Sequence, residues 1–371
     1  MLKNLAKFLL VFGPGFIVME ADNDAGGVQS YMQAGAQFGW SLAWVMLLLL
    51  PITFMVQELA MRLGIISGKG HMALIKERFG KIWAWIAFSD LFALNFLTLL
   101  TEFAAISSIC DALHINRIYG LALISALSFA VIMWQKYRIW EILMVLMCAL
   151  DTSWFIWLYY HPAWDIVPKV SNLADISTWG TVMALIGTTI APWQIFFQQR
   201  CVVDKGLDHS DLFDERVDTF LSAVFTILAA LAMMGAGVYF WKGFSDPTSG
   251  SLFTMIMWSN AAFLGTVCVS LSTSWSFSEM FGEESSLNHT GKKFLGIYIL
   301  AILGASIFCY FSNSLDWDIV AVQILSAILL PLSIGIMVRL LAGLEAISMW
   351  YEVLIWGVIV VLTGTTLWGV L

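Results

Sequence analysis

Three carboxylates lie close together in the middle of a long apolar segment near the start of the sequence. Glu20, Asp22 and Asp24 occur within GPGFIVMEADNDAGGVQSYMQAGAQFG, which runs from Gly13 to Gly39. Ionisable groups at the centre of such a segment persist mainly where they face a cavity, a partner or a transport pathway. Carboxylate oxygens are the ligands that hard cations prefer. This stretch therefore predicts a cation site.

A helix break is expected beside these carboxylates. Gly26 and Gly27 follow Asp24 directly, and glycine weakens a helix by about 1 kcal/mol per residue relative to alanine. A break frees backbone carbonyls, which a hard cation also accepts as ligands. On helical spacing, Glu20 and Asp24 share one face of the segment and Asp22 points away from them.

A second apolar segment carries a breaker near its middle, in GTTIAPWQIFFQQ from residue 187 to 199. Pro192 removes a backbone hydrogen bond, so carbonyls near Thr188 and Thr189 are freed. Thr188 offers the site a hydroxyl or a carbonyl, although back-bonding within its own helix is an equal alternative. Interrupted helices at corresponding positions in two halves are typical of inverted-repeat transporters with a midplane site.

The composition is that of a polytopic membrane protein in a lipid bilayer. Of 371 residues, 60% are hydrophobic and 12% charged, more apolar surface than a soluble domain of this size buries. No basic run indicates nucleic acid, and no HExxH or GxSxG motif indicates an enzyme. The five cysteines are scattered without CxxC spacing and are predicted to be free, packed thiols.

Eleven membrane spans are expected, because a hydrocarbon core of about 30 Å needs about 20 helical residues. They fall near 10–33, 41–64, 82–110, 118–134, 139–160, 179–199, 217–241, 252–280, 294–311, 318–341 and 349–370. We expect residues 1–160 to form a first five-helix repeat and residues 161–341 a second, inverted one. Residues 342–371 then add an eleventh helix.

The positions of Lys and Arg predict the orientation, because cytoplasmic loops keep positive charge. Of 18 such residues, only Arg117, Lys169 and Lys242 fall outside if the N-terminus is cytoplasmic. The C-terminus is then extracytoplasmic. Two stretches assigned to the cytoplasmic side are dense in charge. GKGHMALIKERFGK, at 68–81, is either an amphipathic surface helix or a solvated loop, and we favour the loop; DKGLDHSDLFDERVD, at 204–218, is expected to be a solvated linker rather than a second metal site.

Long motifs in the chain resemble the NRAMP divalent-metal transporters. GPGF at 13–16, QAGAQFG at 33–39 and LAMRLGIISGK at 59–69 look like the first two helices of that family. The resemblance implies an all-α polytopic membrane protein with a LeuT-type 5+5 inverted repeat. Helices 1 and 6 would be broken, and an eleventh transmembrane helix would follow.

The resemblance also implies which residues face the metal. The family's DPGN falls on residues 24–27, so the aspartate is kept as Asp24 and the asparagine becomes Gly27. The family's MPHN falls on residues 191–194, where Ala191 and Trp193 replace methionine and histidine. The implied contacts, which include vestibule or water-mediated ones, are Asp24, Gly27, Ala191, Gln194, Gln323, Glu20, Asp22 and Thr188. For Gln194 and Gln323 the alternative is an interhelical hydrogen bond.

Two further residues are predicted to act in gating or coupling. Glu102, in TEFAAISS, stands where the family has an acidic residue of its proton pathway, and it is a remnant proton site, a gate or a paired structural acid. Trp193 cannot titrate as the family's histidine does, and its ring is expected to narrow the pathway. The loss of that histidine predicts flux without proton coupling.

The departures from the family pattern change which metal the site is expected to favour. A thioether suits soft transition metals, so its loss at Ala191 removes a selective ligand. Mg²⁺ keeps several waters and needs a roomy, acidic site, which Gly27 and the extra acids supply. The leading hypothesis is therefore uptake of hydrated Mg²⁺ by alternating access, as in the NRAMP-related magnesium transporters.

Other functions remain open. One alternative is a proton-coupled Mn²⁺ or Fe²⁺ transporter of the NRAMP type, and another is a LeuT-fold transporter of a small organic substrate. A non-transporting magnesium sensor would keep the same site. The expected setting is a bacterial inner membrane, with the protein acting as a monomer and without a catalytic cofactor.

Overall fold

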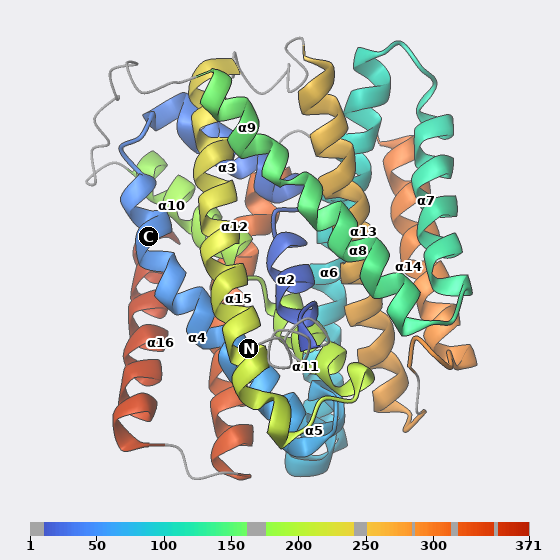
Figure 1. Cartoon of the computed structure of the whole chain (residues 1–371), viewed down its shortest axis with the longest axis vertical. Coiled ribbons are helices and arrows are strands. Elements are labelled where there is room, and N and C mark those ends of the chain that lie inside the picture. The colour runs from blue at the N-terminus through green and yellow to red at the C-terminus, as the bar shows by residue number, and fades with distance from the viewer. Residues whose placement is uncertain are drawn as a thin grey trace, which may run out of the picture.

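A computed structural model describes residues 11–161, 176–240, 251–283, 286–312, 318–344 and 348–370. These residues form one bundle of long helices (Figure 1). In chain order the helices are α2 (Pro14–Glu20), α3 (Ala25–Phe38), α4 (Ala43–Ser67), α5 (His71–Phe79), α6 (Lys81–Ala112), α7 (Arg117–Met133), α8 (Tyr137–Leu150), α9 (Thr152–Tyr160), α10 (Ile176–Thr189), α11 (Pro192–Lys205), η1 (His209–Asp211), α12 (Leu212–Phe240), α13 (Leu252–Met280), α14 (Lys292–Phe311), α15 (Asp318–Ala342) and α16 (Met349–Val370).

The eleven expected spans all find a counterpart in these helices. Within the described part of the chain, nine helices or joined helix pairs are long and apolar enough to cross a membrane. The fourth span is the shorter helix α7, and the first is divided between α2 and α3. The expected start of the first span and the boundary after residue 161 adjoin residues 1–10 and 162–175, which lie outside the described residues. The division into repeats therefore stays a prediction.

Two expectations about loops were wrong. Most of the stretch 68–81 is the helix α5 (His71–Phe79), in which His71, Met72, Leu74 and Ile75 are buried, because its apolar residues pack into the bundle. The stretch 204–218 is not a solvated linker throughout, since α12 begins at Leu212 and both Glu215 and Asp218 are fully buried. The five cysteines are free and buried, as expected.

The two expected helix breaks are present. α2 ends at Glu20 and α3 begins at Ala25, so residues 21–24 form a turn inside the first span. α10 ends at Thr189 and α11 begins at Pro192. Proline fits the first position of a helix because its missing N–H would have no partner there. The second break thus forms at its proline. The first lies just before the glycine pair rather than at it, because Asp24 caps α3 and Gly26 and Gly27 belong to the first turn of that helix.

Small residues bring the broken helices close to their neighbours. A Cβ on Gly35 of α3 would meet the carbonyl oxygen of Met234 on α12, and a Cβ on Gly237 of α12 would meet that of Met32 on α3. One glycine on each helix therefore lets the two backbones touch, as small residues commonly do between membrane helices. α12 in this way holds the second half of the first span.

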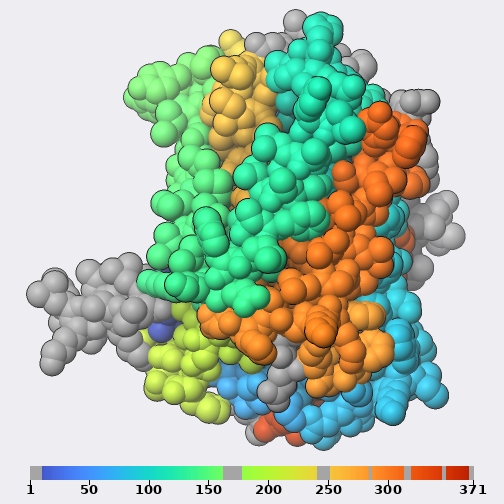
Figure 2. All heavy atoms as spheres, turned by 90° about the vertical axis from the view of Figure 1, so that its right-hand side faces the viewer, coloured from blue at the N-terminus to red at the C-terminus, as the bar shows by residue number. Residues whose placement is uncertain are grey.

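The outer helices complete the bundle. Figure 2 shows α7, α8 and α14 forming one face of the molecule. On another side, α16 packs against α10 and α15, and its Tyr351 hydroxyl donates to Glu58 of α4 at 2.8 Å. Glu58 also accepts from Arg62 and Arg216, so one buried carboxylate joins α4, α12 and α16.

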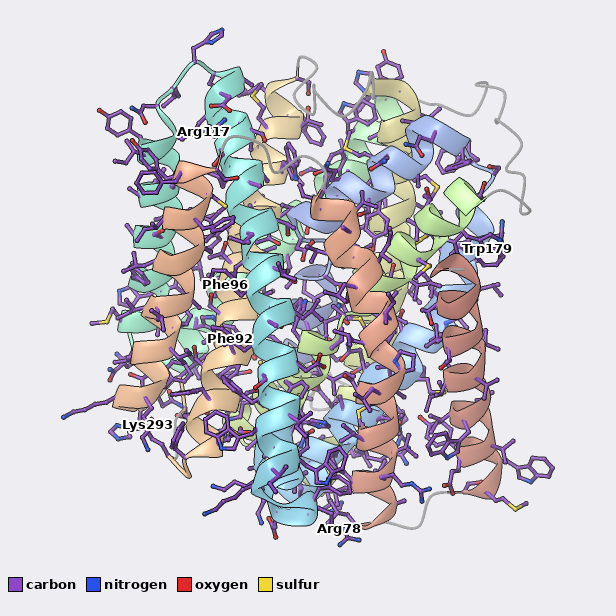
Figure 3. The ribbon with its side chains drawn as sticks, turned by 180° about the vertical axis from the view of Figure 1, so that it is seen from behind. Arg78, Phe92, Phe96, Arg117, Trp179 and Lys293 are labelled. Atoms are coloured by element: carbon purple, nitrogen blue, oxygen red, sulfur yellow. The ribbon has the colours of Figure 1, made fainter. Side chains whose placement is uncertain are left out.

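Cations lie at both ends of the bundle. Figure 3 shows Arg78 and Lys293 at one end and Arg117 at the opposite end. Arg117 is one of the three cations predicted to lie outside, and the other two, Lys169 and Lys242, belong to residues outside the described ranges.

The contact between α3 and α12 predicts the effect of Gly237→Ala. The added methyl group meets a backbone carbonyl that cannot rotate away, and overpacking of this kind costs about 1–3 kcal/mol. We expect a lower midpoint of thermal unfolding in detergent. Gly296→Ala in α14 is the matched control, since nothing lies within 4 Å of its added methyl group. Equal midpoints for the two variants would contradict the close approach.

Candidate functional site

The turn between α2 and α3 is held by hydrogen bonds to its own residues and to two other helices. Asp24 is the N-cap of α3, and its Oδ1 accepts from the Gly27 N–H at 2.7 Å. The Ala25 N–H donates to Glu102 of α6 at 3.1 Å, and the Ala25 carbonyl accepts from Trp258 of α13 at 2.9 Å. The break is thus a fixed part of the bundle.

Three oxygen atoms converge on Gly27 beside this turn. A Cβ at Gly27 would lie 2.8 Å from the Asp22 carbonyl oxygen, 3.2 Å from Thr188 Oγ1 and 3.5 Å from Asp24 Oδ1. The glycine therefore sits at a point where a carbonyl, a hydroxyl and a carboxylate from both broken helices approach one another. We call this arrangement the oxygen cradle.

The first turn of α11 lies near Asp22. The Gln194 side chain lies close to the Asp22 carboxylate. Its Oε1 accepts from the Ala191 N–H at 3.3 Å and from Gln57 Nε2 of α4 at 2.9 Å. The amide thus joins α4 to the second break and leaves its Nε2 without a partner. Ala191, the N-cap of α11, brings no donor atom in its side chain.

Gln323 approaches the turn from α15. Its Nε2 lies where a Cβ on Gly26 would be, and that same Cβ would lie 3.3 Å from Asp24 Oδ1. Gly187 of α10 lets this helix pack directly on the backbone of Gln323. The interhelical contact expected for Gln323 is therefore a close packing contact, and its amide nitrogen has no hydrogen-bond partner.

Unpartnered polar atoms gather around the two breaks. Buried polar groups normally find hydrogen-bond partners, so such a cluster indicates a missing ligand or water. The buried atoms without a protein partner include Asp22 Oδ2, Asn23 Oδ1, Glu102 Oε1, Thr188 Oγ1, Gln194 Nε2 and Gln323 Nε2. Within the described residues no three His, Cys, Asp or Glu side chains form a metal-binding group. An ion here would complete its shell with carbonyl, hydroxyl or water oxygens.

Glu20 does not share a helical face with Asp24, as had been expected. α2 ends at Glu20, so helical spacing does not extend across the turn to Asp24. Glu20 instead accepts from Thr226 Oγ1 of α12 at 2.6 Å and from Asn23 Nδ2 at 3.4 Å. It is buried beside the turn, and its role as a vestibule contact stays a prediction.

The two predicted gating residues have different surroundings. Glu102 is buried beside the turn, bonded to the Ala25 N–H and packed against Gly265 of α13. Trp193 is also buried, but its ring packs edge-on against Phe197, which in turn contacts Trp140 and Trp275. The ring thus belongs to an aromatic cluster between α8, α11 and α13. Its effect on the pathway stays a prediction.

The sequence analysis missed several residues that hold the site. Gln57, Thr226 and Trp258 come from α4, α12 and α13, and each donates a hydrogen bond to a residue at the breaks. The sequence offered one signal for these residues, which is that each is an isolated polar or indole side chain within an apolar span. That signal names no partner, because the partner depends on which helices are neighbours.

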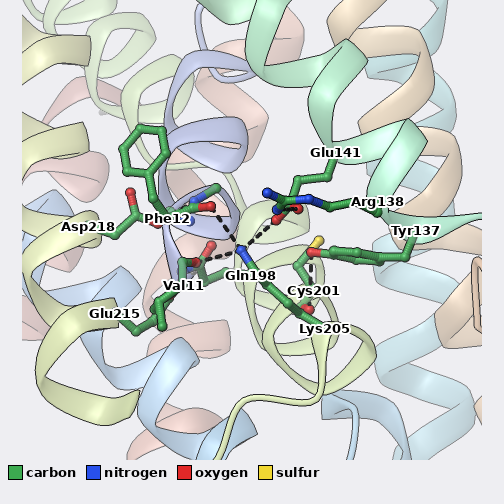
Figure 4. Close-up of polar contacts among 12 residues, drawn as sticks. Val11, Phe12, Tyr137, Arg138, Glu141, Gln198, Cys201, Lys205, Glu215 and Asp218 are labelled. Carbon is green, nitrogen blue, oxygen red and sulfur yellow. Dashed lines mark hydrogen bonds and ion pairs between the residues drawn. The ribbon is translucent and has the colours of Figure 1, made fainter. Parts of the chain in front are cut away.

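A charged cluster anchors the start of α2 (Figure 4). Lys205, at the end of α11, donates to the carbonyls of Val11 and Phe12 at 2.6 and 2.8 Å and pairs with Glu141 of α8 at 2.5 Å. Asp218 of α12 accepts the N–H groups of Gly13 and Gly15 at 3.1 and 3.0 Å. Free carbonyls and N–H groups before α2 are thereby satisfied inside the bundle.

Comparison with known proteins decides the family. Residues 15–371 match the family described as natural resistance-associated macrophage protein-like, or Nramp. The chain belongs to the Nramp family. This match covers almost the whole chain, including the oxygen cradle and the eleventh helix.

Two Nramp relatives show how far the likeness in sequence extends. The metal transporter Nramp6.2 of Populus trichocarpa is 28% identical over 225 residues, which is 55% of this chain and 39% of that protein. The divalent metal cation transporter MntH of Caldanaerobacter subterraneus is 25% identical over 258 residues, which is 64% of this chain and 61% of that protein. The chain thus spans less than two thirds of the length of these relatives.

Solved structures confirm the fold. A manganese transporter of Eremococcus coleocola matches with a TM-score of 0.77 at 16% identity, over 97% of this chain and 86% of that one. A nucleobase-cation-symport-1 family transporter matches with a TM-score of 0.59 at 12% identity, over 88% and 77%. The Nramp chain is therefore an all-α polytopic membrane protein with the LeuT-type arrangement of broken helices.

The anchoring of α2 predicts the effect of Lys205→Met. Two carbonyls and one carboxylate lose their donor, although Arg138 still pairs with Glu141. We expect a loss of about 1–3 kcal/mol in stability, the cost of leaving buried acceptors unsatisfied. Thermal unfolding in detergent measures it. The control is Lys69→Met, because the side chains of Lys69 and Glu77 are 48% and 63% exposed and such pairs contribute only about 0–1 kcal/mol.

Proposed function

We propose that this chain transports a divalent metal cation across a membrane by alternating access. The observation that carries the proposal is the oxygen cradle at Gly27, where Asp22, Asp24 and Thr188 direct three oxygen atoms to one space between the broken helices. Transporters of this architecture bind their cargo at such breaks. The printed names of the relatives, metal transporter and divalent metal cation transporter, describe the same class of cargo.

The donor set favours a hard or borderline cation. Carboxylate, carbonyl and water oxygens suit Mg²⁺, Ca²⁺ and Mn²⁺, whereas soft thioether ligands suit softer metals. Met19 lies in the apolar core, and Ala191 offers no sulfur. We propose Mn²⁺ as the first cargo to test, because a matching solved relative is a manganese transporter.

A specific observation favours Mg²⁺ as the second candidate. Two of the positions at which this chain departs from its family's motif, Gly27 and Ala191, bring no side-chain ligand, so an ion here would keep some of its own waters, as Mg²⁺ prefers. For this candidate we propose that Mg²⁺ enters without proton coupling, because Trp193 cannot titrate. A divalent ion gains about 4.6 kcal/mol from an inside-negative potential of 100 mV, at about 2.3 kcal/mol per charge. That gain alone can drive uptake.

We also propose the orientation and setting predicted from charge. The N-terminus would be cytoplasmic and the C-terminus extracytoplasmic, in a bacterial inner membrane, with a single chain forming the complete pathway. The arrangement of Arg78 and Lys293 at one end and Arg117 at the other supports this orientation (Figure 3).

Metal uptake into proteoliposomes tests the main proposal through Asp24→Asn. Asparagine is also a good N-cap, so the helix start survives while the ligand loses its charge. We expect Mn²⁺ uptake to fall at least about tenfold, equivalent to about 1.4 kcal/mol. Glu77→Gln, at an exposed ion pair, is the control and should transport normally. Unchanged uptake in Asp24→Asn would contradict the cradle as the cargo site.

Ala191→Met tests the role of the missing thioether. A sulfur donor at the start of α11 should raise Cd²⁺ uptake relative to Mg²⁺ uptake, because soft metals gain most from thioether ligation. Parallel Cd²⁺ and Mg²⁺ measurements in the original chain and the variant give this ratio. An unchanged ratio would mean that residue 191 does not face the ion.

Coupling is tested by recording lumen pH during metal entry. If the second candidate holds, Mg²⁺ enters at inside-negative potential without acidifying the lumen. Acidification in step with metal entry would instead favour the proton-coupled Mn²⁺ or Fe²⁺ alternative, and Glu102→Gln should then abolish the pH change.

A further inference from the structure

A cavity of about 560 Å³ lies between α5, α6, α11, α15 and α16. Pockets of this size commonly hold small organic ligands. It is separate from the oxygen cradle, because none of its lining residues is among those predicted to contact the metal. Its walls are apolar apart from His71, Asp90, Ser333 and Arg339.

His71 lies in the wall of this cavity as a neutral, buried side chain. The residue is only 2% exposed, and its Nδ1 lies 2.6 Å from Oε1 of Gln199. That amide donates its own Nε2 to the Lys69 carbonyl, so its oxygen is the atom facing the ring. Nδ1 therefore carries the hydrogen, and Nε2 is an acceptor without a partner. Burial lowers the pKa of His71 to about 4, which keeps the ring neutral at physiological pH.

The cavity also has one cation and one anion on different walls. Arg339, in the last turn of α15, lies over the ring of Trp356 with 5.7 Å between Cζ and the ring centroid. Asp90 is half-buried on α6. Among the described residues neither has an ion-pair partner, so both charges are available to a ligand. Arg78 adds positive charge nearby, since its guanidinium lies against Gly343 just beyond α15.

We infer that this cavity binds the head of an aminophospholipid of the phosphatidylethanolamine class. Arg339 would hold the phosphate, the two carboxylate oxygens of Asp90 would accept N–H groups of the ammonium, and an acyl chain would follow the apolar walls. A guanidinium suits phosphate oxygens, and the ammonium supplies three donors for two acceptors.

The same groups disfavour other common lipids. A choline head has no N–H group and would leave both acceptors unsatisfied. A glycerol head would bring a net negative charge beside Asp90. The cavity is bounded by Pro192 and Phe196 of α11 and by Pro331 of α15, so a bound lipid contacts two helices that carry Gln194 and Gln323.

Native mass spectrometry of the full chain with added lipids tests this inference. The original chain should retain phosphatidylethanolamine at least about fivefold over phosphatidylcholine, the effect expected for one or two hydrogen bonds. The chain should also retain phosphatidylethanolamine in preference to phosphatidylglycerol. Equal retention of phosphatidylethanolamine and phosphatidylcholine, or stronger retention of phosphatidylglycerol, would overturn the inference without reference to any variant.

Two variants assign the contacts. Asp90→Asn should reduce the preference over phosphatidylcholine while retaining phosphate binding, whereas Arg339→Gln should weaken both zwitterionic lipids. Both residues lie on the cavity wall at partly exposed positions, so folding should survive. Lys293→Gln, a cation at the same end that lies over Phe281 outside the cavity, is the control and should keep the preference. An unchanged preference in both cavity variants would overturn the proposed contacts.

Discussion

The structure depends on how an interrupted helix can exist inside a membrane. Hydrocarbon offers no water to backbone groups, so a break is tolerated only where protein satisfies the freed N–H and carbonyl groups. Asp24 does so within the turn, while Glu102 and Trp258 do so from α6 and α13. The break therefore requires the helices that surround it. Of the three oxygens of the cradle, Asp24 Oδ1 accepts the Gly27 N–H, whereas Thr188 Oγ1 has no partner among the described residues.

Buried carboxylates form ion pairs at the end of the bundle but not at its centre. At the end, Glu58 and Glu141 are each paired with two cations. At the centre, Asp22 and Asp24 are buried, and no Lys or Arg among the described residues pairs with them. Buried charges need a compensating partner. The divalent cation proposed as cargo would supply that compensation only while bound, which suits a site that must load and unload.

The proposed cargo site and the proposed lipid site share two helices. α11 begins at the second break, carries Gln194 near the cargo site and lines the lipid cavity with Phe196. α15 places Gln323 beside the cargo site and Arg339 in the wall of the lipid cavity. A shift of either helix would change both sites together.

The spans and the presence of a break in the first and sixth of them were determined by the sequence, because hydropathy and helix breakers act locally. Neighbouring helices decided the rest. Glu20 faces Thr226 of α12 because the helix stops before its spacing could align it with Asp24. Asp218 is buried because it caps α2, some 200 residues earlier in the chain. Only the tertiary structure could make these assignments, since hydrogen-bond partners in a membrane bundle are chosen by proximity between distant segments.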